Sequence, residues 1–186
     1  MRIATLFILS SLLFVECSLI QNGETNQLVQ FDTLRDPKNQ SDFYIQLKES
    51  RFDSINDAID TLRNVWFSRH LIAMKEPIIH EYRGEMEIYR FTLLRTFDQP
   101  VVVKLEKKED SVRLISKMTS GAGGYYCGQL ILDTLYSISL EKYDSLIYEI
   151  DHANFWKLPT TEHKHTGVDG SEWIVEAYQD GRYHLV

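Results

Sequence analysis

Residues 87–118, EIYRFTLLRTFDQPVVVKLEKKEDSVRLISKM, decide the fold of this chain. Between Glu87 and Phe97 apolar and polar side chains alternate, which is the two-residue period of a β-strand. Turn-forming residues at 98–100 and the charged run at 107–110 separate two further strands, which we predict at 101–105 and 112–118. Because connections this short join antiparallel neighbours, the segment predicts an antiparallel meander.

Two amphipathic helices flank these strands. From Ser54 to Trp66 apolar side chains recur every three or four residues, and Ser54 with Asp57 provides capping-box chemistry at the start. A second helix is predicted from Leu140 to His152, with Ser139 as its N-cap. The apolar face of the first helix is predicted to hold Ile55, Ile59, Leu62 and Trp66.

The remaining patterned segments complete the sheet. We predict a fourth strand at 129–136 and a hairpin at 173–186. The fold class is therefore α+β, a twisted and mainly antiparallel sheet with about two helices packed on one face. The organisation that we expect is a leader at 1–17, a polar segment at 18–47 and a single domain at 48–186.

The charge of the chain argues against one class of partner. Its 186 residues include 27 acidic and 20 basic side chains, a formal net charge of −7, and the one dense charged run mixes both signs. Nucleic-acid binding requires clustered lysine and arginine side chains. We therefore exclude nucleic acid as the main partner and expect an unidentified protein or small ligand.

The first 17 residues, MRIATLFILSSLLFVEC, are organised like a secretory signal peptide. Arg2 precedes an apolar run at 3–15 that is too short to span a bilayer. We therefore expect an exported protein, in the periplasm, in the cell envelope or secreted. Cys17 stands where a bacterial lipoprotein carries its acylated cysteine, although Glu16 precedes it where a small residue is usual. A lipid anchor on Cys17 and plain cleavage after it both remain open.

Several side chains are candidates for chemistry. Cys127 could act as a nucleophile if a histidine met it in space, although a structural cysteine is the simpler interpretation. In the loop at 161–170, His163, His165 and Asp169 are ligand types that suit zinc, and a solvated polar loop is the alternative. We predict no resident cofactor.

The glycine-rich segment TSGAGGYYCG at 119–128 could suggest a phosphate-binding loop. Such a loop requires Gly-Lys-Ser/Thr running into a helix, and Tyr125 and Tyr126 stand there instead. We interpret the segment as a wide turn between two strands, with glycines at positive φ.

Two pairing registers are possible for the hairpin at 173–186. A two-residue turn at Asp180-Gly181 would pair Tyr178 with Tyr183 and mix apolar with charged side chains on each face. A three-residue loop at 179–181 sorts the side chains better, so we predict this second register. It makes Glu176 and His184 a cross-strand pair on the outer face, which adds both to Cys127 as candidate catalytic residues.

From about Tyr89 to its end, the chain resembles a group of uncharacterised bacterial exported proteins and lipoproteins. The resemblance rests on Gly-Gly-Tyr at 123–125, Phe-Trp-x-Leu-Pro at 155–159, Asp-Gly-x-x-Trp-x-x-Glu at 169–176 and Gly-x-Tyr-His at 181–184. It implies bacterial export and assigns no catalytic role to any residue.

Three classes of function follow from these patterns. The leading hypothesis is an exported, non-catalytic protein of the bacterial envelope, either lipid-anchored or soluble, that acts by binding or by supporting an assembly. A metal- or thiol-dependent hydrolase using Cys127 or the His163/His165 loop is the alternative. An inhibitor or immunity-type protein is the third, because it fits the acidity and the size of the chain.

Overall fold

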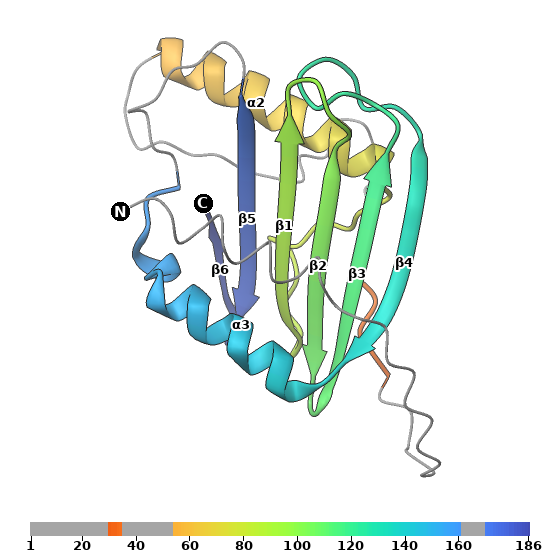
Figure 1. Cartoon of the computed structure of the whole chain (residues 1–186). Coiled ribbons are helices and arrows are strands. Elements are labelled where there is room, and N and C mark those ends of the chain that lie inside the picture. Colours follow the sequence, from red (N-terminus) through yellow and green to blue (C-terminus); the bar gives the residue numbers. More distant parts are fainter. Residues whose placement is uncertain (1–29, 35–53, 161–169) are drawn as a thin grey trace.

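The computed structural model describes residues 30–34, 54–160 and 170–186, with the side chains of its first helix described from Leu62 onward (Figure 1). These residues form an antiparallel sheet and two α-helices, which confirms the predicted α+β class. In chain order the elements are α2 (Ser54–Ala73), β1 (Glu87–Arg95), β2 (Val101–Lys108), β3 (Ser111–Thr119), β4 (Leu130–Ile138), α3 (Leu140–His152), a 3₁₀ turn η1 (Phe155–Lys157), β5 (Ser171–Gln179) and β6 (Arg182–Leu185).

The sheet has the strand order β4-β3-β2-β1-β5-β6, and every neighbouring pair is antiparallel. The predicted meander is confirmed as β1, β2 and β3, which short turns connect. At the β2–β3 turn Glu109 has a positive φ of 52°. β1 lies in the middle of the sheet, between β2 and β5, so its side chains are positioned on both sides by neighbouring strands.

The two helices cover opposite faces of the sheet, whereas we predicted both on one face. α2 packs on Leu94, Val102 and Ile174, and α3 packs on Tyr89 and Val103, which belong to the other face. Figure 1 shows α3 crossing one face near the lower ends of the strands and α2 behind the opposite ends. The prediction differed because it assigned the polar residues of β1 to solvent, while the structure buries both faces of this strand.

α2 begins at the predicted residue, Ser54, but continues to Ala73, seven residues beyond the predicted end at Trp66. The structure places a different face of α2 in the core, because Phe67 and Leu71 are buried, together with Met74 directly after the helix. Leu62, which was predicted to be buried, is 70% exposed. The helix ends where Lys75 adopts a positive φ of 52° and the Glu76 amide donates to the Leu71 carbonyl at 3.0 Å.

α3 agrees with its prediction at both ends, Leu140 and His152. The hydroxyl of Ser139 accepts a hydrogen bond from the backbone amide of Lys142, which satisfies a free donor of the first turn. Three side chains on one face of the helix enter the core, namely Tyr143, Leu146 and Ile150.

The predicted register of the C-terminal hairpin is wrong. β5 and β6 are joined by a two-residue turn in which Asp180 and Gly181 have φ values of 51° and 75°, and Tyr178 lies opposite Tyr183. Glu176 is therefore opposite Leu185, and the predicted Glu176–His184 pair does not form. The prediction failed because it placed charged side chains on the outer face, while Glu176 is fully buried against Arg90.

Candidate functional site

The glycine-rich turn between β3 and β4 lies against the turn between β1 and β2. The amide of Gly123 donates to the Asp98 carbonyl at 3.0 Å, and the amide of Gly124 donates to the Thr96 carbonyl at 3.1 Å. A Cβ atom at Gly123 would lie 2.6 Å from the carbonyl oxygen of Arg95, so this approach requires glycine. The segment runs into β4 and not into a helix, which agrees with our rejection of a phosphate-binding loop.

This packing presents two tyrosine side chains on the surface. Tyr125 and Tyr126 are 60% and 61% exposed, and the ring of Tyr125 contacts the exposed ring of Phe97 with centroids 5.8 Å apart. The predicted positive φ is found at Gly128, whereas Gly123 and Gly124 are required by close backbone contact. Exposed aromatic side chains on a hydrogen-bonded turn are typical of a binding surface.

A cleft of about 450 Å³ lies between this turn and the outer side of α2. This volume is within the range of small-molecule sites, roughly 300–1,000 Å³. We call it the α2 cleft. Its lining comprises Val65, Trp66, Ser68, Arg69 and Ile72 of the helix, with Tyr125, Tyr126 and Cys127 of the turn.

The α2 cleft combines aromatic walls with one cation. Arg69 is the only charged residue in its lining, and its side chain has no carboxylate partner among the described residues. Trp66, Tyr125 and Tyr126 provide flat apolar surfaces around it. This arrangement suits a ligand that has a flat apolar body and an anionic group, because a guanidinium binds oxyanions and also stacks on rings.

Cys127 lies in the cleft as an unoxidised, half-buried thiol. Burial raises the pKa of this thiol, and the positive charge of Arg69 only partly offsets that effect. No histidine is among the described residues that line the cleft. Cys127 is therefore mainly protonated at neutral pH, which is the less reactive form of a cysteine.

His70 follows Arg69 in the sequence but belongs to the interior. It is 1% exposed, and its ring contacts that of Trp66 with centroids 5.2 Å apart. Burial lowers the pKa of His70 to about 4, so the ring is neutral at physiological pH. His70 therefore acts as a packing residue beneath the α2 cleft.

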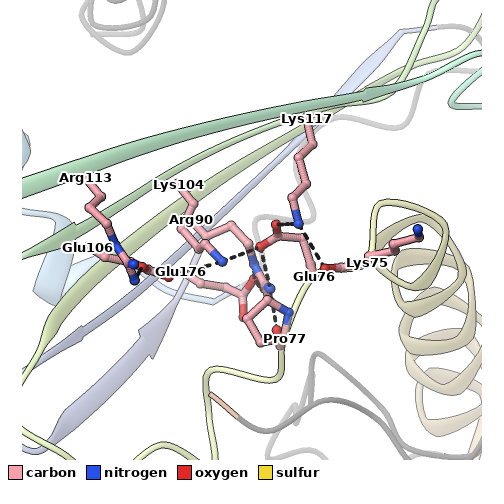
Figure 2. A network of polar contacts seen from close by, with 9 residues as sticks. All are labelled: Lys75, Glu76, Pro77, Arg90, Lys104, Glu106, Arg113, Lys117 and Glu176. Atoms are coloured by element: carbon pink, nitrogen blue, oxygen red, sulfur yellow. Dashed lines mark hydrogen bonds and ion pairs between the residues drawn. The ribbon is translucent and has the colours of Figure 1, made fainter. Parts of the chain in front are cut away.

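A second cluster of charged side chains lies in the interior, between the sheet and the segment that follows α2 (Figure 2). Three of its members are acidic and three are basic, so their formal charges balance. Burying charged groups is costly unless each is paired. We call this set the buried ionic network; its members, all less than a tenth exposed, are Glu76, Arg90, Lys104, Glu106, Lys117 and Glu176.

Glu76 connects the end of α2 to three strands. Its carboxylate lies 3.1 Å from Nζ of Lys104, 3.0 Å from Nζ of Lys117 and 3.5 Å from a terminal nitrogen of Arg90. Burial alone would raise the pKa of Glu76, but the three cations together hold it below its usual value. Lys117 also donates to the backbone carbonyl of Lys75 at 2.9 Å, so it caps the negative end of the helix dipole.

Arg90 joins the same segment to β5. Its Nε donates to Glu176 at 2.6 Å, and a terminal nitrogen lies 2.5 Å from the same carboxylate oxygen. Another terminal nitrogen donates to the Pro77 carbonyl at 2.7 Å. The hydroxyl of Tyr183 donates to the second oxygen of Glu176 at 2.9 Å. Figure 2 shows Arg90, Lys104 and Lys117 extending from the sheet toward residues 75–77.

The network continues through Glu106 to Arg113, which Phe31 contacts. Glu106 lies 3.3 Å from Nζ of Lys104 and is hydrogen-bonded to Arg113 on its other side. The ring of Phe31 stacks on Arg113, with 3.6 Å between the ring centroid and the guanidinium carbon. Asp32 is hydrogen-bonded to Tyr82 and lies 2.5 Å from Nζ of Lys108. Phe31 thus covers part of this end of the network, and Asp32 contacts the neighbouring Tyr82 and Lys108.

The network acts as a clamp. Its contacts fix residues 75–77, and therefore the C-terminal end of α2, against β1, β2, β3 and β5. Removal of one member of a buried ion pair leaves the other charge uncompensated, which typically costs about 3–5 kcal/mol. Because residues of α2 line one side of the α2 cleft, the network also helps to fix the position of that side relative to the sheet.

The structure places the three candidate catalytic residues in three separate environments. Cys127 is in the α2 cleft, and Glu176 is in the buried ionic network. His184 packs against the rings of Phe155 and Trp156, and its Nε2 lies 3.1 Å from the Leu158 carbonyl oxygen. His163, His165, Asp169 and Cys17 lie outside the described residues, so their predicted roles stay predictions.

Two further observations concern the part of the chain that the structure describes. No three metal-ligating side chains come together there. None of its helices combines the length and the apolar character that a membrane span requires.

Sequence reasoning missed both the buried ionic network and Arg69. Arg90, Lys104 and Glu106 occupy alternate positions of β1 and β2, and such positions normally face water. The network could have been predicted from the number of charged residues on β1 and β2, because strands in the middle of a sheet are usually buried. Arg69 could not be identified, because the predicted helix ended three residues before it.

Comparison with known proteins gives no match: no protein-family model, curated protein or solved structure matches this chain. The resemblance of the C-terminal half to exported bacterial proteins therefore stays a prediction.

Proposed function

We propose that this chain is an exported, non-catalytic binding domain of the bacterial cell envelope, and that the α2 cleft is its binding site. The observation that carries the proposal is Arg69, which has no carboxylate partner among the described residues, beside the aromatic side chains of the cleft. Exposed aromatic residues around a hollow are costly to keep in water unless a ligand covers them.

The state of the reactive groups supports a function without catalysis. Burial raises the pKa of the Cys127 thiol, and in the part of the chain that the structure describes no histidine lines its cleft. The charged residues of the interior are closed to solvent and are paired with one another. A catalytic site needs an accessible group whose protonation state suits the reaction, and neither region has this combination.

The lining of the cleft defines the class of ligand. Arg69 would bind a carboxylate, sulfonate or phosphate group, and Trp66 and the two tyrosines would contact a flat apolar body. Ser68 supplies a further polar group at the helix side of the cleft. The ligand that we propose is therefore a small amphipathic anion.

A fluorescent probe of this chemistry tests the binding site. We expect 1-anilinonaphthalene-8-sulfonate to bind the mature chain, with its fluorescence rising as it leaves water. Arg69→Gln should weaken this binding about tenfold, because it removes a charge-assisted hydrogen bond. Binding of the uncharged analogue N-phenyl-1-naphthylamine should not change in the same variant.

Arg63→Gln is the matched control. Arg63 also lies on α2, but it pairs with Glu172 at 3.6 Å and does not line the cleft. Its substitution should leave binding of both probes unchanged. Equal weakening by the two arginine substitutions, or none by Arg69→Gln, would contradict the proposed site.

Export is tested separately, by the intact mass of the chain recovered from bacterial cells. Loss of residues 1–16 together with a diacylglyceryl addition on Cys17 indicates a lipid anchor, and loss of residues 1–17 indicates plain cleavage. A full-length chain in the cytoplasm would contradict export while leaving the binding proposal intact.

A further inference from the structure

The two edges of the sheet differ in how they are protected from other strands. β6 has only four residues and carries Arg182 and His184. β4 has nine residues, no proline or lysine, and a single charged residue, Asp133. Long and weakly charged edge strands normally pair with another strand, and natural proteins otherwise blunt them with charges, prolines or bulges.

β4 also exposes apolar side chains on both of its faces. Leu135 is 56% exposed on the α2 face, where it lies opposite Ile115 of β3. Leu132 and Tyr136 are 40% and 47% exposed on the α3 face. Apolar side chains on a strand that has a neighbouring strand on both sides are rarely this exposed. These side chains would therefore be buried by one more strand beside β4.

The sequence of β4 complements itself in one register. The pairing between β3 and β4 shifts between Met118 and Thr119, which leaves a bulge at Ile131 and a regular ladder from Leu132 to Ile138. The middle of that ladder is Leu135. If a second β4 runs antiparallel about Leu135, Leu132 meets Ile138, and Asp133 meets the hydroxyl of Ser137.

Neighbouring registers are less favourable. Pairing about Asp133 brings two carboxylates face to face, and like charges directly opposite each other are destabilising. Pairing about Thr134 places Asp133 against Leu135 and draws the bulge at Ile131 into the ladder. The register about Leu135 avoids both penalties and uses the whole regular part of the strand.

We propose that β4 pairs with β4 of a second copy of this chain, antiparallel about Leu135, so that two sheets join into one continuous sheet. The contact is symmetric, with the same surface on both subunits and a two-fold axis at Leu135. It lies on β4 and does not include the residues that line the α2 cleft, so each subunit keeps its own cleft.

Charge substitution at the symmetry axis tests this dimer. Sedimentation or light scattering of the mature chain should show a dimer at micromolar concentrations. Leu135→Lys and Leu135→Glu should each be monomeric, with the dissociation constant raised about 30-fold or more by two like charges and two lost apolar contacts. An equimolar mixture of the two variants should again form dimers, because lysine then faces glutamate.

Tyr148→Lys is the control for a charge at another exposed apolar position. Tyr148 is 66% exposed on α3, so this variant should dimerise like the wild type. Circular dichroism and the unfolding midpoint check that each variant is folded. If Leu135→Lys does not fold, Leu135→Cys in a Cys127→Ser chain replaces it. Oxidation should then link two subunits through position 135, while Ser137→Cys should give no such link.

Three results would overturn the proposal. A monomeric wild type would show that β4 does not pair with itself, and pairing with a strand of another protein would then explain its exposure. A folded Leu135→Lys variant that remains dimeric would place the interface elsewhere. Failure of the mixed variants to associate would exclude the register about Leu135.

Discussion

Both faces of the sheet have an apolar core, but the α2 face also contains the buried ionic network. Under α3 the side chains are mainly apolar, as with Tyr89, Leu105 and Leu114, which pack on the helix. Beneath the end of α2 the sheet instead presents the buried ionic network, in which Arg90 and Glu76 form directional contacts. Apolar burial stabilises without fixing one orientation, whereas ion pairs with defined geometry do fix one. The directional ion pairs lie on the α2 face, where the position of the helix determines the shape of the α2 cleft.

The largest effect should follow from breaking the clamp on the α2 face. Arg90→Met leaves Glu176 without its main buried partner, and the free energy of unfolding should fall by about 3–5 kcal/mol. Urea denaturation followed by tryptophan fluorescence measures this change. The double variant Arg90→Met/Glu176→Met should recover part of the loss, because no charge is then stranded. A double variant that is no more stable than the single one would show that packing, not charge, explains the loss.

A cavity on the α3 face should cost somewhat less and should show no electrostatic signature. Leu105 is fully buried, and Leu105→Ala should lower the free energy of unfolding by about 2–4 kcal/mol, through lost apolar contact and an unfilled cavity. The loss should be equal in low and high salt. A loss that varies strongly with salt would mean that the two faces are not electrostatically distinct.

Close backbone packing at the glycine-rich turn should give an intermediate effect on the α2 face. A methyl group at Gly123 would collide with the Arg95 carbonyl, so Gly123→Ala should cost about 1–3 kcal/mol and weaken probe binding in the α2 cleft. Gly170→Ala is the control, because a Cβ there meets nothing within 4 Å. Comparable losses from both substitutions would indicate a general effect of removing glycine.

The smallest effect concerns acid. The folded-state pKa of His70 is about 4, below its usual 6.5, so the unfolded chain binds the extra proton between these values and stability falls as the pH drops from 6.5 to 4. His70→Leu should reduce this slope by up to about 1.4 kcal/mol per pH unit near pH 5. Below about pH 4.5, protonation of Glu76, whose folded pKa is lowered, should add a further loss in both proteins.

Unfolding midpoints between pH 4 and 7 measure this difference. His152→Leu provides a comparison, because His152 is an exposed histidine at the end of α3. An unchanged slope in His70→Leu would show that the buried imidazole is not the group that titrates.

The local features of the fold could be predicted from the sequence, and the features that depend on distant partners could not. The meander and α3 followed from the spacing of apolar residues and from the cap at Ser139. The hairpin register failed because its outcome depends on Arg90, which is 86 residues from Glu176 in the sequence. Periodicity describes which residues share a face, but it does not say which charged residue finds a buried partner.

The same limit explains what was predicted of the candidate site. The glycine-rich segment at 119–128 was correctly interpreted as a turn between two strands, and Cys127 was considered separately as a possible nucleophile. Arg69 and Trp66 were not connected with that turn, because α2 and the turn are joined only through the folded sheet. When a cleft is formed by two segments that are distant in the sequence, the residue pattern of either segment alone does not predict it.

Lys117 contacts the backbone of Lys75 across 42 residues of sequence, and Glu176 reaches Arg90 across 86. Contacts between such distant residues form slowly, because the intervening chain must first be ordered. Glu176 belongs to β5, so the buried ionic network is complete only once β5 has joined the sheet. During synthesis, a chain that has emerged only through β4 already has five members of the buried ionic network, but it lacks Glu176, the partner that lies 2.5 Å from Arg90. We expect the cleft to become functional as one of the final events of folding.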